Sequence, residues 1–163
     1  MKAIALALVA AYVAALVLAM VSDILFRRIP NWAVVALIAV FAAVVSAGLS
    51  PHPLWASLAA AGISLAAGFT LFAFNVIGAG DAKLFAATAL FAGLQNLGAL
   101  ALATVLIGGL MAVVVLVVRP KRALAGLTKR GRETGAGGIP YGVPIACAAL
   151  LASWTSGFLQ SWT

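Results

Sequence analysis

Long apolar runs, separated by short polar segments, follow one another along nearly the whole chain. Several of these runs approach the roughly 20 residues that an α-helix needs to cross the hydrocarbon core of a bilayer. The stretch 82–118 is too long for one ordinary span, and the polar residues Gln95 and Asn96 interrupt it, so we expect a turn there. The pattern predicts six membrane-spanning helices, at about residues 4–25, 32–49, 54–77, 82–94, 97–118 and 139–159.

The composition of the chain excludes a water-soluble globule. Hydrophobic residues make up 66% of the 163 residues and charged residues 8%, against roughly 45–50% and about 25% in ordinary soluble domains. The length is that of one domain. We therefore expect residues 1–163 to form a single all-α membrane domain, a six-span polytopic helical bundle with a short fourth span. Because Cys147 is the only cysteine, the chain has no internal disulfide and no CxxC motif.

The net charge of +7 is of the kind found in nucleic-acid-binding proteins, but the basic residues lie between apolar runs, where they set membrane topology. With six spans, all ten Lys and Arg residues except Lys2 fall on one side of the membrane. With five spans, the loop containing Arg27 and Arg28 and the basic segment after residue 118 face opposite sides, against the positive-inside rule. We therefore expect both termini outside and a basic cytoplasmic loop over 119–138. Membrane lipid is an expected partner and nucleic acid is not.

The chain contains three acidic residues, Asp23, Asp81 and Glu133. Asp23 precedes Arg27 by four residues, so in a continuous helix it lies about 6 Å deeper in the membrane. Asp81 precedes a short span that reaches only about 20 Å of a roughly 30 Å core, which places it about 10 Å below the cytoplasmic face. Both carboxylates are thus predicted at similar depth on one side. We expect their helices to be neighbours, their carboxyls to share one polar cavity, and residues 78–80 to be non-helical and line it.

Each acid has a structural interpretation as well as a functional one. Asp81 can be a helix N-cap, and Asp23 can pair with Arg27 across one turn. For either acid alone the two interpretations are balanced, but two carboxylates at a costly depth together favour function. Two adjacent carboxylates are the minimum equipment for aspartic proteolysis, in which an ionised acid activates water and a protonated acid binds the peptide carbonyl. Such a pair titrates as a unit, so neither residue is assigned the acid role.

Around these two acids the chain resembles a known family. Asp23 with residues 27–31 (RRIPN), and residues 78–84 (GAGDAKL), resemble the two signature segments of type IV prepilin peptidases, which are six-span GxGD aspartic proteases. Residues 139–144 (IPYGVP) resemble a third segment of that family. The resemblance implies that Asp23 and Asp81 are the catalytic pair, in a bacterial cytoplasmic (inner) membrane with the active site toward the cytoplasm. No metal or other cofactor is expected, because two carboxylates without a nearby histidine or cysteine make a poor metal site.

The resemblance also implies a substrate. Members of the family cleave a short basic leader from prepilins at the cytoplasmic face, usually after a glycine. Larger members carry a cytosolic segment between early spans, often with paired CxxC motifs, and also methylate the new amino terminus. This chain has no room for that segment and no cysteine pair. It is similar to the short form associated with Flp or tight-adherence pili, which implies a peptidase without a methyltransferase domain, acting on an Flp-type pilin or pseudopilin.

Further residues of these segments are candidates for binding the substrate or shaping the site, and each also has a structural interpretation. Asn31 can cap the second helix, a role that we favour over substrate contact. Lys83 can neutralise the aspartate pair or extend to the membrane interface. Tyr141 can anchor the chain at that interface. The candidates are Gly78, Gly80, Lys83, Pro30, Asn31, Pro140, Tyr141 and Gly142.

The main alternative function is a small polytopic transporter or proton-linked channel that uses the two aspartates as relay groups. It requires a polar path that continues to the outer face. The outer halves of the predicted spans contain almost no ionisable residue, which favours the peptidase. His52, the only histidine, falls in the predicted external turn 49–54, where we expect a simple loop residue and neither a ligand nor a base.

Overall fold

The computed structural model describes residues 2–118 and 141–155. Within these ranges every regular element is an α-helix, so the all-α prediction is confirmed. The predicted basic loop, Glu133, Pro140 and the ends of the predicted last span lie outside the described residues. The helices are α1 (Lys2–Phe26), α2 (Asn31–Ser46), α3 (Leu54–Ala73), α4 (Ala79–Val118) and α7 (Gly142–Thr155).

The length and composition of the helices suit a membrane. Among the described helices, α1, α3 and α4 are long and apolar enough to cross one, whereas α2 and α7 are shorter apolar helices. The outside of the bundle carries many large, exposed apolar side chains, including Phe26, Phe69 and Val117. Lipid tails are the solvent in which such a surface is stable, because in water it would be a large unpaired apolar patch.

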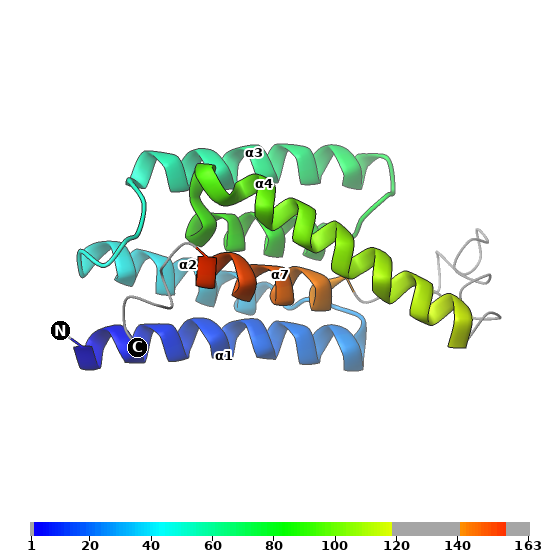
Figure 1. Ribbon diagram of the computed structural model, residues 1–163, viewed down its shortest axis with the longest axis horizontal. Helices are drawn as coiled ribbons and strands as arrows, with labels where there is room; N and C mark the ends of the chain where they lie inside the picture. The colour runs from blue at the N-terminus through cyan, green and yellow to red at the C-terminus, as the bar shows by residue number, and fades with distance from the viewer. Residues whose placement is uncertain (1, 119–140, 156–163) are drawn as a thin grey trace.

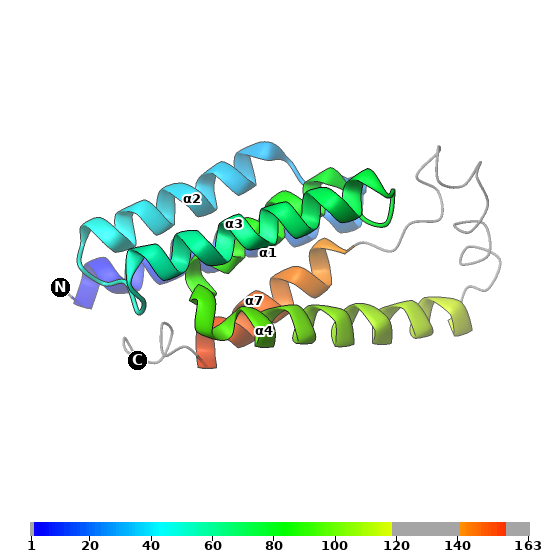
Figure 2. The same ribbon diagram turned by 90° about the horizontal axis from the view of Figure 1, so that it is seen from above.

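The helices form an elongated bundle, and the end of α4 extends past the other described helices (Figures 1 and 2). The α4 helix packs against α2, α3 and α7, and α1 packs against α2 and α7. Aromatic side chains join three of these helices in the core: the ring centroid of Phe91 lies 4.4 Å from that of Tyr12 and 5.4 Å from that of Phe41. The buried Tyr12 hydroxyl lies 2.7 Å from Ser153 Oγ, which ties α1 to α7.

Two helices end earlier than the apolar runs suggest, because a residue with positive φ follows each of them. Gly48 has φ +70° after α2, and Asn75 has φ +57° after α3. In both cases two backbone N–H groups fold back onto carbonyls of the last turn, Leu49 to Val44 in the first and Val76 to Leu71 in the second. This is the Schellman arrangement, which satisfies the last carbonyls and stops the helix while the sequence remains apolar.

The break within α4 falls at Gly93 and not at Gln95 and Asn96, where the sequence predicted it. Gly93 has φ 67° and ψ 172°, so two helical segments meet there. Glycine adopts this backbone without a steric cost. Asn96 contributes a polar contact at this break, because its side-chain Nδ2 donates a hydrogen bond of 3.2 Å to the carbonyl oxygen of Ala92, the residue before Gly93. Gln95 and Asn96 are themselves helical, so the prediction of a turn at these two residues is wrong by a few positions.

His52 packs against this break. It lies in the connection between α2 and α3, as expected, but it is half-buried and its Nε2 is enclosed without a hydrogen-bond partner. A Cβ atom on Gly93 would lie 2.6 Å from Cδ2 of His52. The imidazole therefore occupies the space that the absence of a side chain leaves at residue 93, and His52 is a packing residue as well as a loop residue.

Gly93→Ala is expected to destabilise the bundle. The backbone of residue 93, at φ 67° and ψ 172°, is a region essentially restricted to glycine, and an L-residue there costs about 1–3 kcal/mol. The clash with His52 adds to that cost. The melting temperature in detergent should therefore fall. The matched control is Gly98→Ala on the same helix, where nothing lies within 4 Å of the added Cβ and alanine favours the helix. A Gly93→Ala protein that melts with or above the wild type would contradict this account of the break.

Candidate active site

Asp23 lies in the last turn of α1, which ends at Phe26. The expected continuous helix from Asp23 to Arg27 thus stops one residue short, because Arg27 has φ 55°. Its side chain is 6% exposed. The carboxylate Oδ2 accepts a hydrogen bond of 2.7 Å from the backbone N–H of Gly142, the first residue of α7. Arg27, expected as a one-turn partner, acts on Asp23 as a nearby charge, and the close polar contact of Asp23 is with α7.

The contact between Asp23 and Gly142 has a clear physical basis. The first N–H groups of a helix have no partner within that helix, and the helix dipole is positive at this end. A carboxylate placed there satisfies one of these donors and is favoured by the dipole. The approach also requires glycine, because a Cβ at residue 142 would lie 2.8 Å from Oδ2 and 3.0 Å from Cβ of Asp23. The sequence made Gly142 a candidate, and the structure places its backbone N–H against Asp23.

Asp81 lies in the first turn of α4, two residues after the helix begins at Ala79. Its Oδ2 accepts a hydrogen bond of 3.2 Å from the backbone N–H of Gly78. A side chain that reaches back from the third helical residue to the residue before the helix forms half of a capping box. Asp81 therefore caps the helix from within its first turn and is not itself the N-cap residue. One such bond leaves most of the acceptor capacity of a carboxylate unused, so capping does not exclude chemistry at Asp81.

The two glycines before Asp81 differ in structure. Gly78 is non-helical, as predicted, but Gly80 belongs to the first turn of α4, so the expectation of a non-helical segment over 78–80 is only partly met. The helix begins early because the Asp81 carboxylate holds the N–H of Gly78. Gly80 has a packing role: a Cβ there would lie 3.2 Å from Cβ of Ile29. Because residue 80 has no Cβ atom, the connection between α1 and α2 can approach α4 closely.

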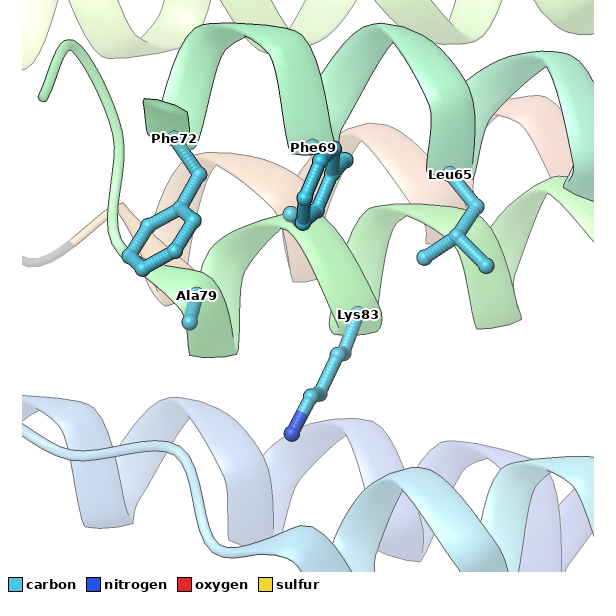
Figure 3. Close-up of a pocket in the computed structure, with 6 residues that line it drawn as sticks. Leu65, Phe69, Phe72, Ala79 and Lys83 are labelled. Carbon is cyan, nitrogen blue, oxygen red and sulfur yellow. The ribbon is translucent and has the colours of Figure 1, made fainter. Parts of the chain in front are cut away.

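Lys83 and Asn31 contact each other across two helices. Nζ of Lys83 donates to Oδ1 of Asn31 at 3.3 Å, and both residues are exposed. Figure 3 shows the Lys83 side chain extending from α4 away from the aromatic side chains of α3. The N-cap of α2 is Pro30, and no side chain caps the helix. The favoured role of Asn31 as the cap is therefore wrong, because Asn31 already has helical backbone and its side chain binds the lysine instead.

The two aspartates lie at the same end of the bundle. The end of α1 and the starts of α4 and α7 meet there (Figures 1 and 2). Asp23 and Asp81 are close enough for the charge of one to act on the other. The start of α7 links them, because Gly142 binds Asp23 while Tyr141 lines a cavity together with Asp81. This arrangement brings two carboxylates to one end of the bundle, each held by a backbone N–H, and places Asp81 at an accessible cavity.

That cavity has a volume of about 290 Å³ and lies between α3, α4 and α7. Asp81 is among its lining residues and Asp23 is not, and apolar side chains form most of its wall. A polar cavity shared by both acids stays a prediction, since this cavity reaches Asp81 while the carboxylate of Asp23 binds the N–H of Gly142 at the start of α7. The lining residues are Ser64, Ala67, Gly68, Leu71, Ile77, Asp81, Ala82, Phe85, Ala101, Thr104, Val105, Tyr141 and Ile145.

Sequence reasoning passed over two polar residues of this cavity, Thr104 of α4, whose hydroxyl binds the carbonyl oxygen of Leu100, and Ser64 of α3. The only sequence signal of Ser64 was a serine within an apolar run, which small-residue helix packing also explains.

The part of the chain that the structure describes contains no group of three or more His, Cys, Asp or Glu side chains that could hold a metal ion.

Comparison with known proteins gives one match. The model of the type IV leader peptidase family matches residues 10–117. This range includes Asp23 and Asp81. It covers α2 and α3 completely, α1 without its first residues and α4 without its last residue, and it does not reach α7. No curated protein and no solved structure matches the chain.

Proposed function

This chain belongs to the type IV leader peptidase family, and from that premise we propose that it removes the basic leader of a prepilin by a two-aspartate mechanism. The observation that carries the proposal is the meeting of Asp23 and Asp81 at one end of the bundle, each with a carboxylate oxygen bound by a backbone N–H. The family match favours a peptidase over a transporter or channel that would use the same acids as relay groups.

In the proposed mechanism the two carboxyls share the proton transfers. The ionised acid takes a proton from water, which attacks the carbonyl carbon of the scissile peptide. The protonated acid donates a hydrogen bond to the carbonyl oxygen, which gains negative charge as the tetrahedral intermediate forms. Proton transfer to the leaving nitrogen then breaks the peptide bond. The pair acts as one unit, so the acid and base roles are not divided between Asp23 and Asp81.

The backbone N–H groups of Gly78 and Gly142 serve this mechanism by fixing the carboxylates. Each N–H binds Oδ2 of its aspartate, at 3.2 Å for Asp81 and 2.7 Å for Asp23. A fixed carboxylate needs little reorganisation when water and substrate arrive, which is a large part of how active sites lower barriers. Gly78, Gly80 and Gly142 are thus site-shaping residues in this proposal. The border of the proposed site lies at the start of α2, where Pro30 is the N-cap and Asn31 binds Lys83 of α4.

The proposed setting is the bacterial cytoplasmic membrane, with six spans and the aspartates toward the cytoplasm. The break at Gly93 supports the division of α4 into two spans. Six spans put both termini outside and the loop 119–138 in the cytoplasm, as the positive-inside rule favours. The proposed substrate is an Flp-type pilin or pseudopilin. Because α1 ends at Phe26 and α2 begins at Asn31, the connection between them is too short for a methyltransferase segment, and we propose proteolysis alone, without a cofactor.

The topology can be tested with reporter tags. A tag at either terminus should be accessible from the non-cytoplasmic side, whereas a tag within 119–132 should be accessible only from the cytoplasm. Placing the tags one at a time in whole cells and in permeabilised cells separates the two cases. A cytoplasmic amino terminus together with a cytoplasmic 119–132 segment would contradict the six-span arrangement.

The function itself is tested by co-expression of the chain with a candidate Flp-type prepilin. We expect the prepilin to shift on a gel to the size of the leaderless form only when the chain is present. A prepilin in which the residue before the scissile bond is replaced by a bulky side chain is the matched substrate control and should remain uncut. An unprocessed prepilin in the presence of well-expressed chain would count against that substrate class.

A further inference from the structure

Ser64 is a buried residue of α3 whose hydroxyl has no partner. Its side chain is 3% exposed, and its Oγ makes no hydrogen bond. Two other hydroxyls on these helices bind the carbonyl four residues earlier, Thr70 with Ala66 at 2.9 Å and Thr104 with Leu100 at 2.8 Å. A buried hydroxyl without a partner is unfavourable. Ser64 also lines the cavity that contains Asp81, so a ligand in that cavity can supply the missing partner.

The cavity that Ser64 lines is suited to an apolar side chain. Its volume of about 290 Å³ is roughly twice the ~150 Å³ that accommodates a benzene ring in an engineered protein cavity. It is also at the lower limit of the roughly 300–1,000 Å³ typical of sites for whole drug-sized ligands. The space thus fits one or two side chains and is too small for a helix. Leu71, Phe85 and Val105 supply apolar walls, and Asp81 forms part of the lining.

Rotation about χ1 is the step that brings the hydroxyl of Ser64 to this cavity in our proposal. Oγ itself is enclosed in the wall, but a serine side chain exchanges between staggered χ1 positions. Since no hydrogen bond holds the hydroxyl where it is, the exchange breaks none. A peptide in the cavity offers backbone carbonyl oxygens, which are strong acceptors. The unpaired donor and the apolar space thus match the two parts of one ligand, the main chain and a side chain.

We propose that this cavity is the subsite for an apolar side chain adjacent to the scissile bond, and that Ser64 binds the substrate main chain there through a hydrogen bond to a carbonyl oxygen. The inference rests on the proposed function, because it takes Asp81 as part of the catalytic pair. It goes beyond that function by naming the subsite, the chemical class of its occupant and a residue that holds the substrate.

The test of Ser64 has a close internal control. Ser57 is on the same helix, two turns earlier, fully buried, with an Oγ that also has no partner, but it does not line the cavity. With purified enzyme and a prepilin peptide, Ser64→Ala should raise KM roughly two- to tenfold, with kcat nearly unchanged, as expected for loss of one substrate hydrogen bond. Ser57→Ala should match the wild type. Ser64→Thr, which keeps the hydroxyl, should restore most of the affinity.

The outcomes separate binding from packing. A purely structural role for Ser64 would lower kcat or the melting temperature and leave KM unchanged, and that result would overturn the proposal. The same kinetic constants for Ser64→Ala and Ser57→Ala would also overturn it. In both cases the proposed function stands if the wild type cleaves and Asp81→Asn does not. If the wild type fails to cleave any prepilin, the proposed function and the subsite fall together.

The apolar part of the subsite is tested by filling it. Ala101 lines the cavity, and Ala99, on the same segment of α4, is exposed and does not. Ala101→Leu should raise KM severalfold for a substrate with a large apolar residue beside the scissile bond, and much less when that residue is alanine. Ala99→Leu should not change KM for either substrate. Equal effects of Ala101→Leu on both substrates would show that the cavity does not hold that side chain.

Discussion

Asp23→Asn and Asp81→Asn are each expected to abolish leader cleavage while leaving the amount of protein unchanged. An amide cannot act as the ionised base or as the acid, and loss of a general acid or base costs about 10²–10⁴-fold in rate. The fold should tolerate both changes, because an asparagine keeps a carbonyl oxygen that can accept the N–H of Gly142 or Gly78. The measurement is the single-turnover rate of prepilin cleavage by purified protein, with the melting temperature recorded in the same detergent.

The control for this prediction is Lys83→Ala. Lys83 is two residues from Asp81, but its hydrogen bond is to Asn31, and both partners are exposed. Its removal should therefore reduce activity only mildly. If either asparagine variant cleaved at the wild-type rate, the two-aspartate mechanism would be wrong. Loss of activity together with loss of protein would instead support the structural interpretation, in which Asp23 and Asp81 mainly hold helices together.

Gly142→Ala is expected to have the next largest effect. The new methyl group would lie 2.8 Å from Oδ2 of Asp23, so either the carboxylate or the start of α7 must move. Movement lengthens the 2.7 Å hydrogen bond from the N–H of Gly142 and displaces the acid. A displacement of about 1 Å in a catalytic group can cost about 10²-fold in rate. We expect a loss of that order in kcat, measured with purified protein on the same prepilin.

The comparison variant is Gly109→Ala, where nothing lies within 4 Å of the added Cβ. It should cleave at the wild-type rate. Gly142→Ala should also melt at a temperature close to that of the wild type, because the change disturbs one contact at the end of the bundle and leaves the Tyr12–Phe91 core intact. Full activity of Gly142→Ala would contradict the role of this glycine in holding Asp23.

The sequence predicted the class and most helices of this protein well, because apolar periodicity and length dominate membrane helices. It placed Asp23 inside α1 and Asp81 beside the start of α4, as the structure has them. It missed the position of the break in α4, since polarity at Gln95 and Asn96 was a weaker determinant than the backbone freedom of Gly93. The helix ends at Gly48 and Asn75 were missed for a related reason, because positive φ stops a helix where hydropathy does not.

The site was harder to predict, because its contacts join residues far apart in the sequence. The hydrogen bond from Gly142 to Asp23 spans 119 positions, and no local pattern indicates which carboxylate a distant helix start will meet. The hydrogen bond between Lys83 and Asn31 also joins residues far apart in the sequence, and it uses the Asn31 side chain that we had expected to cap α2. A serine within an apolar run was the only sequence signal of Ser64, and only the packed structure reveals that its hydroxyl lacks a partner.

The most direct test of the central claim, that this chain is itself a two-aspartate leader peptidase, uses purified components in lipid vesicles. Wild-type protein and a purified prepilin are incubated without added metal or cofactor, and the products are weighed by mass spectrometry. The account predicts two products, the leader and the mature pilin, whose masses sum to that of the prepilin plus one water, and an intact prepilin with Asp81→Asn. An intact prepilin with the wild type, or the same two products with Asp81→Asn, would contradict it.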